Sequence, residues 1–410
     1  MDHDKLLNLG AELGRRLMTS GAEIYRVEES VDRLLSAYGA TAQVFAIPTC
    51  LIVSVNTPEG HPVTRMCRIP AHGTDIELLE RCNALCRRLC REPLPLEEAQ
   101  VLVERLEPEC RQFSPWVLLL GYAAAASFFS LFFGGSARDW LAAALCGAAV
   151  GACLLFGQPF TGSNVFFRTL ICSAVAAGMA LLLVRSGLGQ SQECITIGTL
   201  MVLVPGMALT NAMREIMAGD IISGLTRTAE VLLVATAIAL GTAIPLLFGG
   251  ALSGSTIAAP QCFTDYLLPC LWAFCACVGF GLEFNIQGRG ILICGCGAAL
   301  GWLVYLLSTH FLAGDIPAAF LAAASIGLYS EVMARVRRCP VTGYLQVALL
   351  PLVPGAGIYH AMQYCVSGDT QLFLSTLLHT LGFAAALSVG AMLITSLLRA
   401  LLPRFHLGIH

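Results

Sequence analysis

Long stretches without a charged side chain are the feature that most restricts how this chain can fold. The longest lie at 112–137, 140–167, 194–213, 231–264, 290–314, 339–368 and 370–398, and shorter ones at 169–184, 266–282 and 316–330. A helix needs about 20 apolar residues to cross a bilayer. The sequence therefore predicts ten membrane spans, at about 115–134, 138–156, 166–185, 194–216, 229–249, 263–283, 289–309, 315–334, 341–363 and 379–402.

The charges are concentrated at the start of the chain. Hydrophobic residues make up 56% of the sequence and charged residues 12%, about half the charged share of an ordinary soluble protein. Residues 1–114 nevertheless hold 13 of the 24 basic and 17 of the 27 acidic groups. We expect a soluble domain over 1–114, followed by a domain in membrane lipid with halves 115–250 and 262–410.

Composition excludes several kinds of chemistry. Lys5 is the only lysine and follows no glycine-rich loop, so the chain has no P-loop for ATP. It contains neither HExxH nor GxSxG, and its net charge of −3 without a basic patch argues against nucleic-acid binding. Cys82, Cys86 and Cys90 share a helix face, but their spacing favours packing over a metal site. We expect no cofactor and no enzyme activity.

The pattern of the first 114 residues predicts a small α+β domain. Helices are expected at 3–18, 22–38, 75–91 and 96–107, with β-rich runs at 42–56 and 61–69. Glu23, Arg26 and Glu28 lie close together on the second helix. Their spacing favours ion pairs on a solvated helix face.

The membrane domain contains an internal repeat. LVPGMALTNAM at 203–213 matches LVPGAGIYHAM at 352–362, and Gly219-Asp220 matches Gly368-Asp369, both at an offset of 149. CGAAVG at 146–151 matches CGAALG at 296–301 at an offset of 150. The shift superimposes five spans on the next five. Because five is odd, the second copy must enter the membrane upside down, which is the inverted repeat of many secondary transporters.

Loop charges predict the orientation. With the N-terminus inside, nine arginines lie in inner loops and the tail: Arg168, Arg214, Arg227, Arg289, Arg335, Arg337, Arg338, Arg399 and Arg404. Only Arg138 and Arg185 lie outside. Positive residues collect on the cytoplasmic side, so we expect both termini and the soluble domain there.

Two proline–glycine pairs predict where substrate binds. Pro205-Gly206 and Pro354-Gly355 stand at equivalent positions in spans 4 and 9. Proline removes a backbone hydrogen bond, so each pair is expected to break its helix. The half-helix that follows offers free N–H groups and a positive dipole end, which suit a carboxylate. A simple packing kink is the competing interpretation.

Polar residues near the breaks supply the remaining candidates. Thr210, Asn211 and Arg214 follow the first break, and Tyr359 and His360 follow the second. We predict that they bind substrate, with His360 as a candidate proton carrier or alternatively an interfacial residue. The predicted coupling or gate residues, which could instead form a boundary set of ion pairs, are Glu215, Asp220, Arg227, Glu230, Glu283, Asn285, Arg289 and Asp369.

Several segments resemble the threonine/serine exporter family. The run PGMALTNAMREIMAGDIISGLTRTAEVLL at 205–233 is similar to the family signature, as are SGAEIYRVEE at 20–29 and FFGGSARDW at 132–140. GFGLEFNIQGRG at 279–290 and PLVPGAGIYHAM at 351–362 look like the family's smaller membrane component. Here the two components are fused. Glu215 stands where family members often carry aspartate, so the carboxylate is kept one methylene further out.

The resemblance implies an inner (plasma) membrane exporter of threonine and serine, driven by an ion gradient, with protons as the expected ion. Related two-subunit systems imply a second candidate substrate, a C4 dicarboxylate such as succinate. A homo-oligomer is a possible assembly. A passive channel and a membrane-anchored hydrolase are the remaining alternatives. The hydrolase would need a nucleophile–base pair among Ser20, Ser30, Cys50, His61 and His72, which show no recognised spacing.

Overall fold

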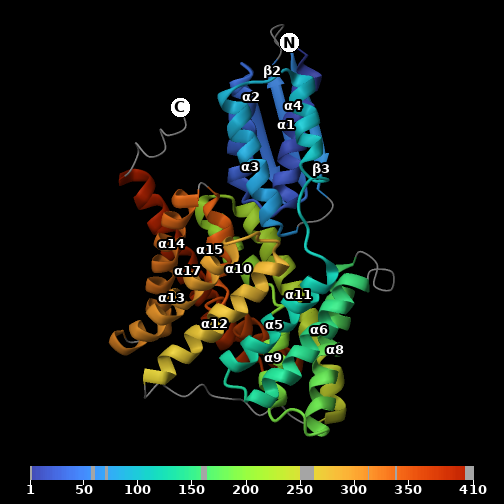
Figure 1. The fold of residues 1–410 in the computed structure, drawn as a ribbon, viewed down its shortest axis with the longest axis vertical. Coiled ribbons are helices and arrows are strands. Elements are labelled where there is room, and N and C mark those ends of the chain that lie inside the picture. The colour runs from blue at the N-terminus through green and yellow to red at the C-terminus, as the bar shows by residue number, and fades with distance from the viewer. Residues whose placement is uncertain are drawn as a thin grey trace.

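The protein is an α+β domain stacked on one end of a helical membrane domain (Figure 1). The computed structural model describes residues 2–56, 61–69, 73–157, 164–249, 263–312, 314–337 and 339–401. Three residues named in the sequence analysis lie outside these ranges: His72, Arg338 and Arg404. Residue 250 of the first predicted membrane half, and residues 262 and 402–410 of the second, also lie outside them.

The soluble domain packs four helices against a three-stranded sheet. The helices are α1 (His3–Thr19), α2 (Ile24–Ala37), α3 (Ile76–Arg91) and α4 (Leu96–Arg105), and the antiparallel strands are β1 (Ala42–Ile47), β2 (Cys50–Asn56) and β3 (Pro62–Arg68). The predicted β-rich run 42–56 forms a hairpin of two strands. Pro48 and Thr49 form its two-residue turn, between the paired residues Ile47 and Cys50. Proline suits the first central position of a type I or II turn, because its ring fixes φ at a negative value.

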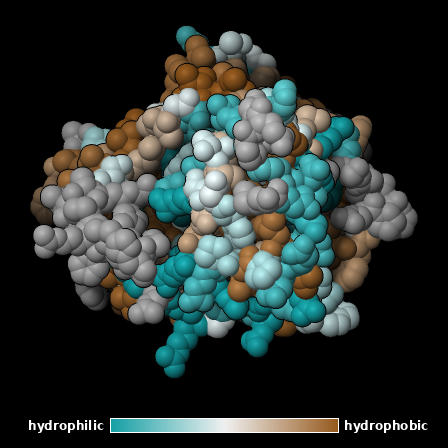
Figure 2. All heavy atoms as spheres, turned by 90° about the horizontal axis from the view of Figure 1, so that it is seen from above, coloured by the Kyte–Doolittle hydropathy of each residue, from teal (hydrophilic) through white to brown (hydrophobic). Residues whose placement is uncertain are grey.

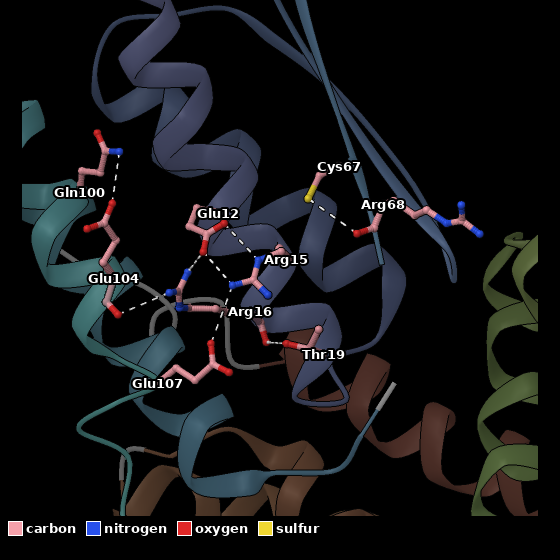
Figure 3. A network of polar contacts seen from close by, with 9 residues as sticks. All are labelled: Glu12, Arg15, Arg16, Thr19, Cys67, Arg68, Gln100, Glu104 and Glu107. Carbon is pink, nitrogen blue, oxygen red and sulfur yellow. Dashed lines mark hydrogen bonds and ion pairs between the residues drawn. The ribbon is translucent and has the colours of Figure 1, made fainter. Parts of the chain in front are cut away.

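An apolar stripe and a polar network hold the domain together. Leu6, Leu9, Leu13 and Leu17 of α1 are buried, as the helical period requires. Figure 3 shows the network on the other side of α1, where Glu12 accepts hydrogen bonds from Arg15 and Arg16. Arg16 also donates to the backbone carbonyl of Glu104 (3.4 Å), and Arg15 pairs with Glu107 (3.7 Å). These contacts fasten the α4 region to α1.

The membrane domain contains eight long helices in the described ranges that are apolar enough to span a bilayer. They are α5 (Pro115–Phe132), α6 (Ala137–Phe156), α8 (Val165–Arg185), α11 (Ile221–Gly249), α12 (Phe263–Glu283), α13 (Gly290–Phe311), α14 (Asp315–Arg337) and α17 (Thr370–Leu401). Between them stand two pairs of short helices, α9 (Gln192–Leu200) with α10 (Gly206–Ala218), and α15 (Val341–Leu349) with α16 (Gly355–Ser367).

The outer surface of the long helices is apolar. Trp116, Leu182 and Phe311 are among the exposed large side chains. Seen from the soluble-domain end, hydrophilic residues gather over the centre and hydrophobic residues toward the rim (Figure 2). An exposed apolar surface of this extent requires a lipid environment, so the chain is a multi-pass membrane protein.

The same pairs of helices touch in each half of the membrane domain. α5 packs on α6 as α12 packs on α13, and α8 packs on α11 as α14 packs on α17. Across the halves, α5 contacts α12, while α10 contacts α17 and α11 contacts α16. The first and second halves therefore use one packing plan.

α11 and α17 begin earlier than the sequence predicted. They start at Ile221 and Thr370, whereas the predicted spans start at 229 and 379. Gly219 and Gly368, with φ of 102° and 83°, end the preceding short helices in the left-handed conformation. The aspartate that follows then opens the next helix, and the side chain of Asp369 accepts from the Leu372 N–H at 3.0 Å.

Asp139, in the segment FFGGSARDW, positions the first short helix. It is 1% exposed and forms a capping box with Ser136 at the start of α6. Its second oxygen accepts from the backbone N–H groups of Gln190 (2.6 Å) and Ser191 (2.8 Å), just before α9. One buried carboxylate thus ties the start of α6 to the start of α9.

Candidate functional site

The two predicted helix breaks are present and lie against each other. α10 and α16 each begin at the glycine of a Pro-Gly pair, with the proline at the cap position. A Cβ on Gly206 would lie 2.0 Å from Cγ1 of Val353, and a Cβ on Gly355 would lie 2.8 Å from Cγ1 of Val204. Both distances are shorter than any van der Waals contact, so a side chain at either position would force the facing valine to move.

A cavity of about 460 Å³ adjoins the first break. This volume lies within the range of small-molecule sites. Its wall includes Pro205 and the first turn of α10, the ends of α12 and α15, and the soluble domain. The N–H groups of a helix's first turn have no partner within the helix, so α10 presents backbone donors to this space.

Four predicted residues line the cavity with side chains of mixed charge: Asn211, Arg227, Glu230 and Glu283. Glu283 is half-buried, and its Oε2 has no hydrogen-bond partner among the described residues. Glu230 is exposed. Arg227 lies 3.0 Å from the carboxylate of Glu215, which is 3% exposed, so its charge is already compensated. The uncompensated charge at the cavity is therefore acidic.

Sequence reasoning missed Tyr122 and Gln346, which also line the cavity. Gln346 is 6% exposed on α15 and is the one amide in an apolar helix. A polar side chain at membrane depth usually faces a cavity, so this signal was available. Tyr122 stands in an apolar run and offered no such signal.

Thr210 does not line this cavity. It is 2% exposed, and its hydroxyl donates to the Gly206 carbonyl at 3.3 Å. Its own carbonyl accepts from Ser388 of α17 at 2.9 Å. In this structure Thr210 holds α10 against α17, and its role in substrate binding stays a prediction.

The residues after the second break pack against other side chains and do not line the cavity. Tyr359 is 2% exposed and lies in an apolar cluster with Ile197, Leu200 and Ile238. The His360 ring stands 5.3 Å from the Tyr359 ring, centroid to centroid. Gly355 approaches Val204 of the first break. Pro354, Gly355, Tyr359 and His360 are not among the residues that line the cavity.

Arg214 pairs with the soluble domain. Its guanidinium donates to Glu23 at 2.5 Å, although 191 residues separate the two. Glu23 also lies 3.0 Å from Arg26 and is 6% exposed. The prediction of a solvated face is thus wrong for Glu23, because the membrane domain covers it. Burial raises the pKa of Glu23, but the two guanidinium groups outweigh it and hold that pKa below its usual range.

Glu28 and the remaining predicted gate residues are not among the residues that line the cavity. Glu28 accepts from the Ala46 N–H at 2.8 Å and so joins α2 to the sheet. Asn285 is 5% exposed and donates to Asp75 of the soluble domain at 2.9 Å. Arg289 is exposed, and Asp220, like Asp369, follows a helix-ending glycine. The described residues contain no group of three His, Cys, Asp or Glu side chains placed to hold a metal ion.

Comparison with known proteins shows the family of the chain. Residues 8–249 match the family described as "Putative threonine/serine exporter", and residues 269–397 match "Threonine/Serine exporter, ThrE". No solved structure matches the chain.

Curated relatives span most of the chain. The "Threonine/serine exporter" of Corynebacterium glutamicum is 23% identical, over 99% of this chain and 86% of the relative. The "Probable threonine/serine exporter" of Mycobacterium tuberculosis is 23% identical, over 95% and 75%. The "Pheromone-regulated membrane protein 10" of Saccharomyces cerevisiae is 23% identical, over 83% and 44%. The chain belongs to the threonine/serine exporter family of transporters, with both family domains fused in one polypeptide.

Proposed function

We propose that this chain exports threonine and serine by alternating access, and that the cavity beside the first break is its substrate site. The observation that carries the proposal is the convergence of the α10 N-terminal turn, Asn211 and Glu283 on one cavity. A zwitterion fits this set. The substrate carboxylate would meet the free N–H groups of α10, Asn211 would bond its polar groups, and its ammonium would lie near Glu283 and Glu230.

The charge balance favours an amino acid over a C4 dicarboxylate. A second carboxylate would need a second cationic partner. Arg214 already pairs with Glu23, and Arg227 with Glu215. Two further carboxylates, Glu230 and Glu283, line the same space.

An inverted repeat of five and five spans is the proposed basis of alternating access. In its favour, α9 and α10 at 192–200 and 206–218 correspond to α15 and α16 at 341–349 and 355–367, each shifted by 149. The end of α10 (Arg214, Ala218) and the start of α15 (Val341, Thr342) line one small cavity with Glu23 of the soluble domain. The two broken spans thus run in opposite directions, as inversion requires.

We assign the soluble domain to the cytoplasmic side of the inner (plasma) membrane and protons as the coupling ion. Nine inner against two outer arginines support the orientation. Glu283 is the favoured proton carrier, since it faces the cavity with an unbonded oxygen, whereas His360 does not line it.

Counterflow in proteoliposomes tests the substrate assignment. Vesicles are preloaded with unlabelled serine, threonine or succinate and given the matching labelled compound outside. We expect label to accumulate with serine and threonine, and about tenfold less in Asn211→Ala, as the loss of one hydrogen bond to substrate implies. Accumulation with succinate alone would move the chain to dicarboxylate export. Label that only equilibrates would indicate a channel.

A further inference from the structure

The soluble domain forms part of the wall of the transport cavity. Gly21, Gly73 and Thr74 are lining residues, although they belong to two loops of the soluble domain. Backbone hydrogen bonds join these loops, from the Gly73 N–H to Thr19 (3.0 Å) and from the Asp75 N–H to Ser20 (3.1 Å). The two loops therefore make one edge that covers the cavity on the soluble-domain side.

A buried ion pair attaches this domain to the substrate-site helix. Arg214 lies one helical turn after Asn211 on α10 and pairs with Glu23, and both side chains are at most 6% exposed. When such a pair separates into water, each charge regains its hydration, so the pair can open and close without leaving a charge stranded. Motion of α10 and motion of the soluble domain are linked through this contact.

Space for such a motion lies beside the pair. A second cavity of about 240 Å³ is lined by Glu23, Arg26 and Arg214, together with Thr342 of α15 and Thr395 of α17. Most of the lining is apolar, but its charged and hydroxyl side chains give entering water hydrogen-bond partners as the charges part. The buried pair thus borders a cavity.

Further contacts between the domains include hydrogen bonds, among them those from Asn285 and Gln287 to the Arg111 carbonyl, and close apolar packing. The Ile76 N–H donates to the Phe284 carbonyl at 3.0 Å, and Asn285 donates to Asp75 at 2.9 Å. A Cβ on Gly343 of α15 would lie 2.7 Å from Cγ2 of Ile76. The last three of these contacts touch a helix of the predicted broken spans or the end of α12, which carries Glu283.

We infer that the soluble domain is the movable lid of the transport cavity, latched by the Glu23–Arg214 ion pair and lifted once in every transport cycle. The inference rests on the proposed function, because alternating access requires the cavity to open on each side in turn. In the present structure Gly21, Gly73 and Thr74 cover one side. Substrate can pass there only if this edge moves away from α10 and α12.

A reversible cross-link between the domains tests the lid. A Cβ on Gly343 would lie 2.7 Å from Cγ2 and 3.7 Å from Cγ1 of Ile76, so the two positions are close enough for a disulfide. The variant Ile76→Cys/Gly343→Cys is reconstituted, and serine counterflow is measured after oxidation and again after reduction. We expect at least a tenfold loss of exchange on oxidation and recovery on reduction.

A matched control carries a disulfide that does not join the domains. Ser54 and Thr64 are paired across β2 and β3, with their hydroxyls 2.9 Å apart. Ser54→Cys/Thr64→Cys and the parent chain, which contains 18 cysteines of its own, receive the same oxidation. Both are expected to keep exchange. Full exchange by a completely cross-linked Ile76→Cys/Gly343→Cys protein would overturn the lid.

Hydrogen exchange gives a test without substitution. The Ile76 amide is bonded across the domain boundary, so peptides that cover 73–79 should exchange faster during serine turnover than without serine. Equal exchange in the two conditions would count against the lid. Absence of counterflow in the reduced parent chain would instead refute the proposed function, so the two failures are distinguishable.

Discussion

The two breaks are followed by α10 and α16, which have the same length and the same kinds of helix ends but carry different side chains. Each has 13 residues, begins at a glycine after proline and ends at a left-handed glycine. Their side chains at equivalent positions differ as follows: Thr210, Asn211, Arg214 and Glu215 on α10 against Tyr359, His360, Gln363 and Tyr364 on α16.

In our proposal the two helices divide the work, and α10 is the one that binds substrate. Break and cap residues recur because the backbone path depends on them. The charged pair Arg214–Glu215 occurs only on α10, which lines the cavity and contacts the soluble domain. α16 instead packs Tyr359 into an apolar cluster. Similar helix ends therefore coexist with different contacts: α10 lines the cavity, and α16 packs into the apolar cluster.

The largest expected effect tests the acidic side of that site. Glu283→Gln keeps the shape of the side chain but cannot carry a proton, so accumulation driven by a pH gradient should fall about a hundredfold. Serine counterflow should fall less, about tenfold, because it loses one contact to the substrate ammonium. The measurement compares both activities in the same vesicles. Glu331→Gln is the control, since Glu331 is also buried on a long helix but is not among the cavity-lining residues. Gradient-driven accumulation that survives Glu283→Gln would remove Glu283 as the proton carrier.

The next largest effect is expected on stability, when Gly206 or Gly355 at the contact of the two breaks is replaced. Gly206→Ala should destabilise the protein by about 1–3 kcal/mol, because its Cβ would overlap Val353. Gly355→Ala should cost less, since its nearest contact is longer, 2.8 Å against 2.0 Å. Thermal stability in detergent measures both. Val353→Ala should partly rescue Gly206→Ala, and an additive loss in the double variant would show that the two breaks do not press on each other.

These short helices were predictable because their determinants are local. Proline and glycine at 205–206 and 354–355 set where each break falls, and the repeat drew attention to both. The extended starts of α11 and α17 were missed, since hydropathy marks the apolar core of a helix and not its cap. Pro48 also signalled the end of a strand, and its position within an apolar run hid the hairpin.

The Glu23–Arg214 pair could not have been predicted in the same way. Each residue alone satisfies a local pattern, Glu23 an ion pair three residues from Arg26 and Arg214 the charged end of a span. Their contact depends on how two domains dock, which no short-range spacing encodes. The same holds for Asn285 and Asp75.

A smaller effect should distinguish the roles of the two breaks in serine counterflow. His360→Ala should change serine counterflow by no more than about twofold, because His360 does not line the cavity, whereas Asn211→Ala should lower it about tenfold. Initial rates at several serine concentrations compare the two variants. A loss in His360→Ala as large as that in Asn211→Ala would place substrate at both breaks and end the division of work proposed here.

The smallest effect concerns acid. The pKa of Glu23 lies below its ordinary value of 4.5 in the docked structure, so the ion pair stabilises docking fully above that value and less as the pH falls through the lowered pKa. Exchange of the Ile76 amide, corrected for its intrinsic rate, should therefore accelerate below about pH 4.5. Glu23→Gln cannot titrate, so its docking should be weaker at neutral pH and should lack this step. If Glu23→Gln showed the same acceleration below about pH 4.5, another carboxylate would cause it, and the Glu23–Arg214 pair would not control docking.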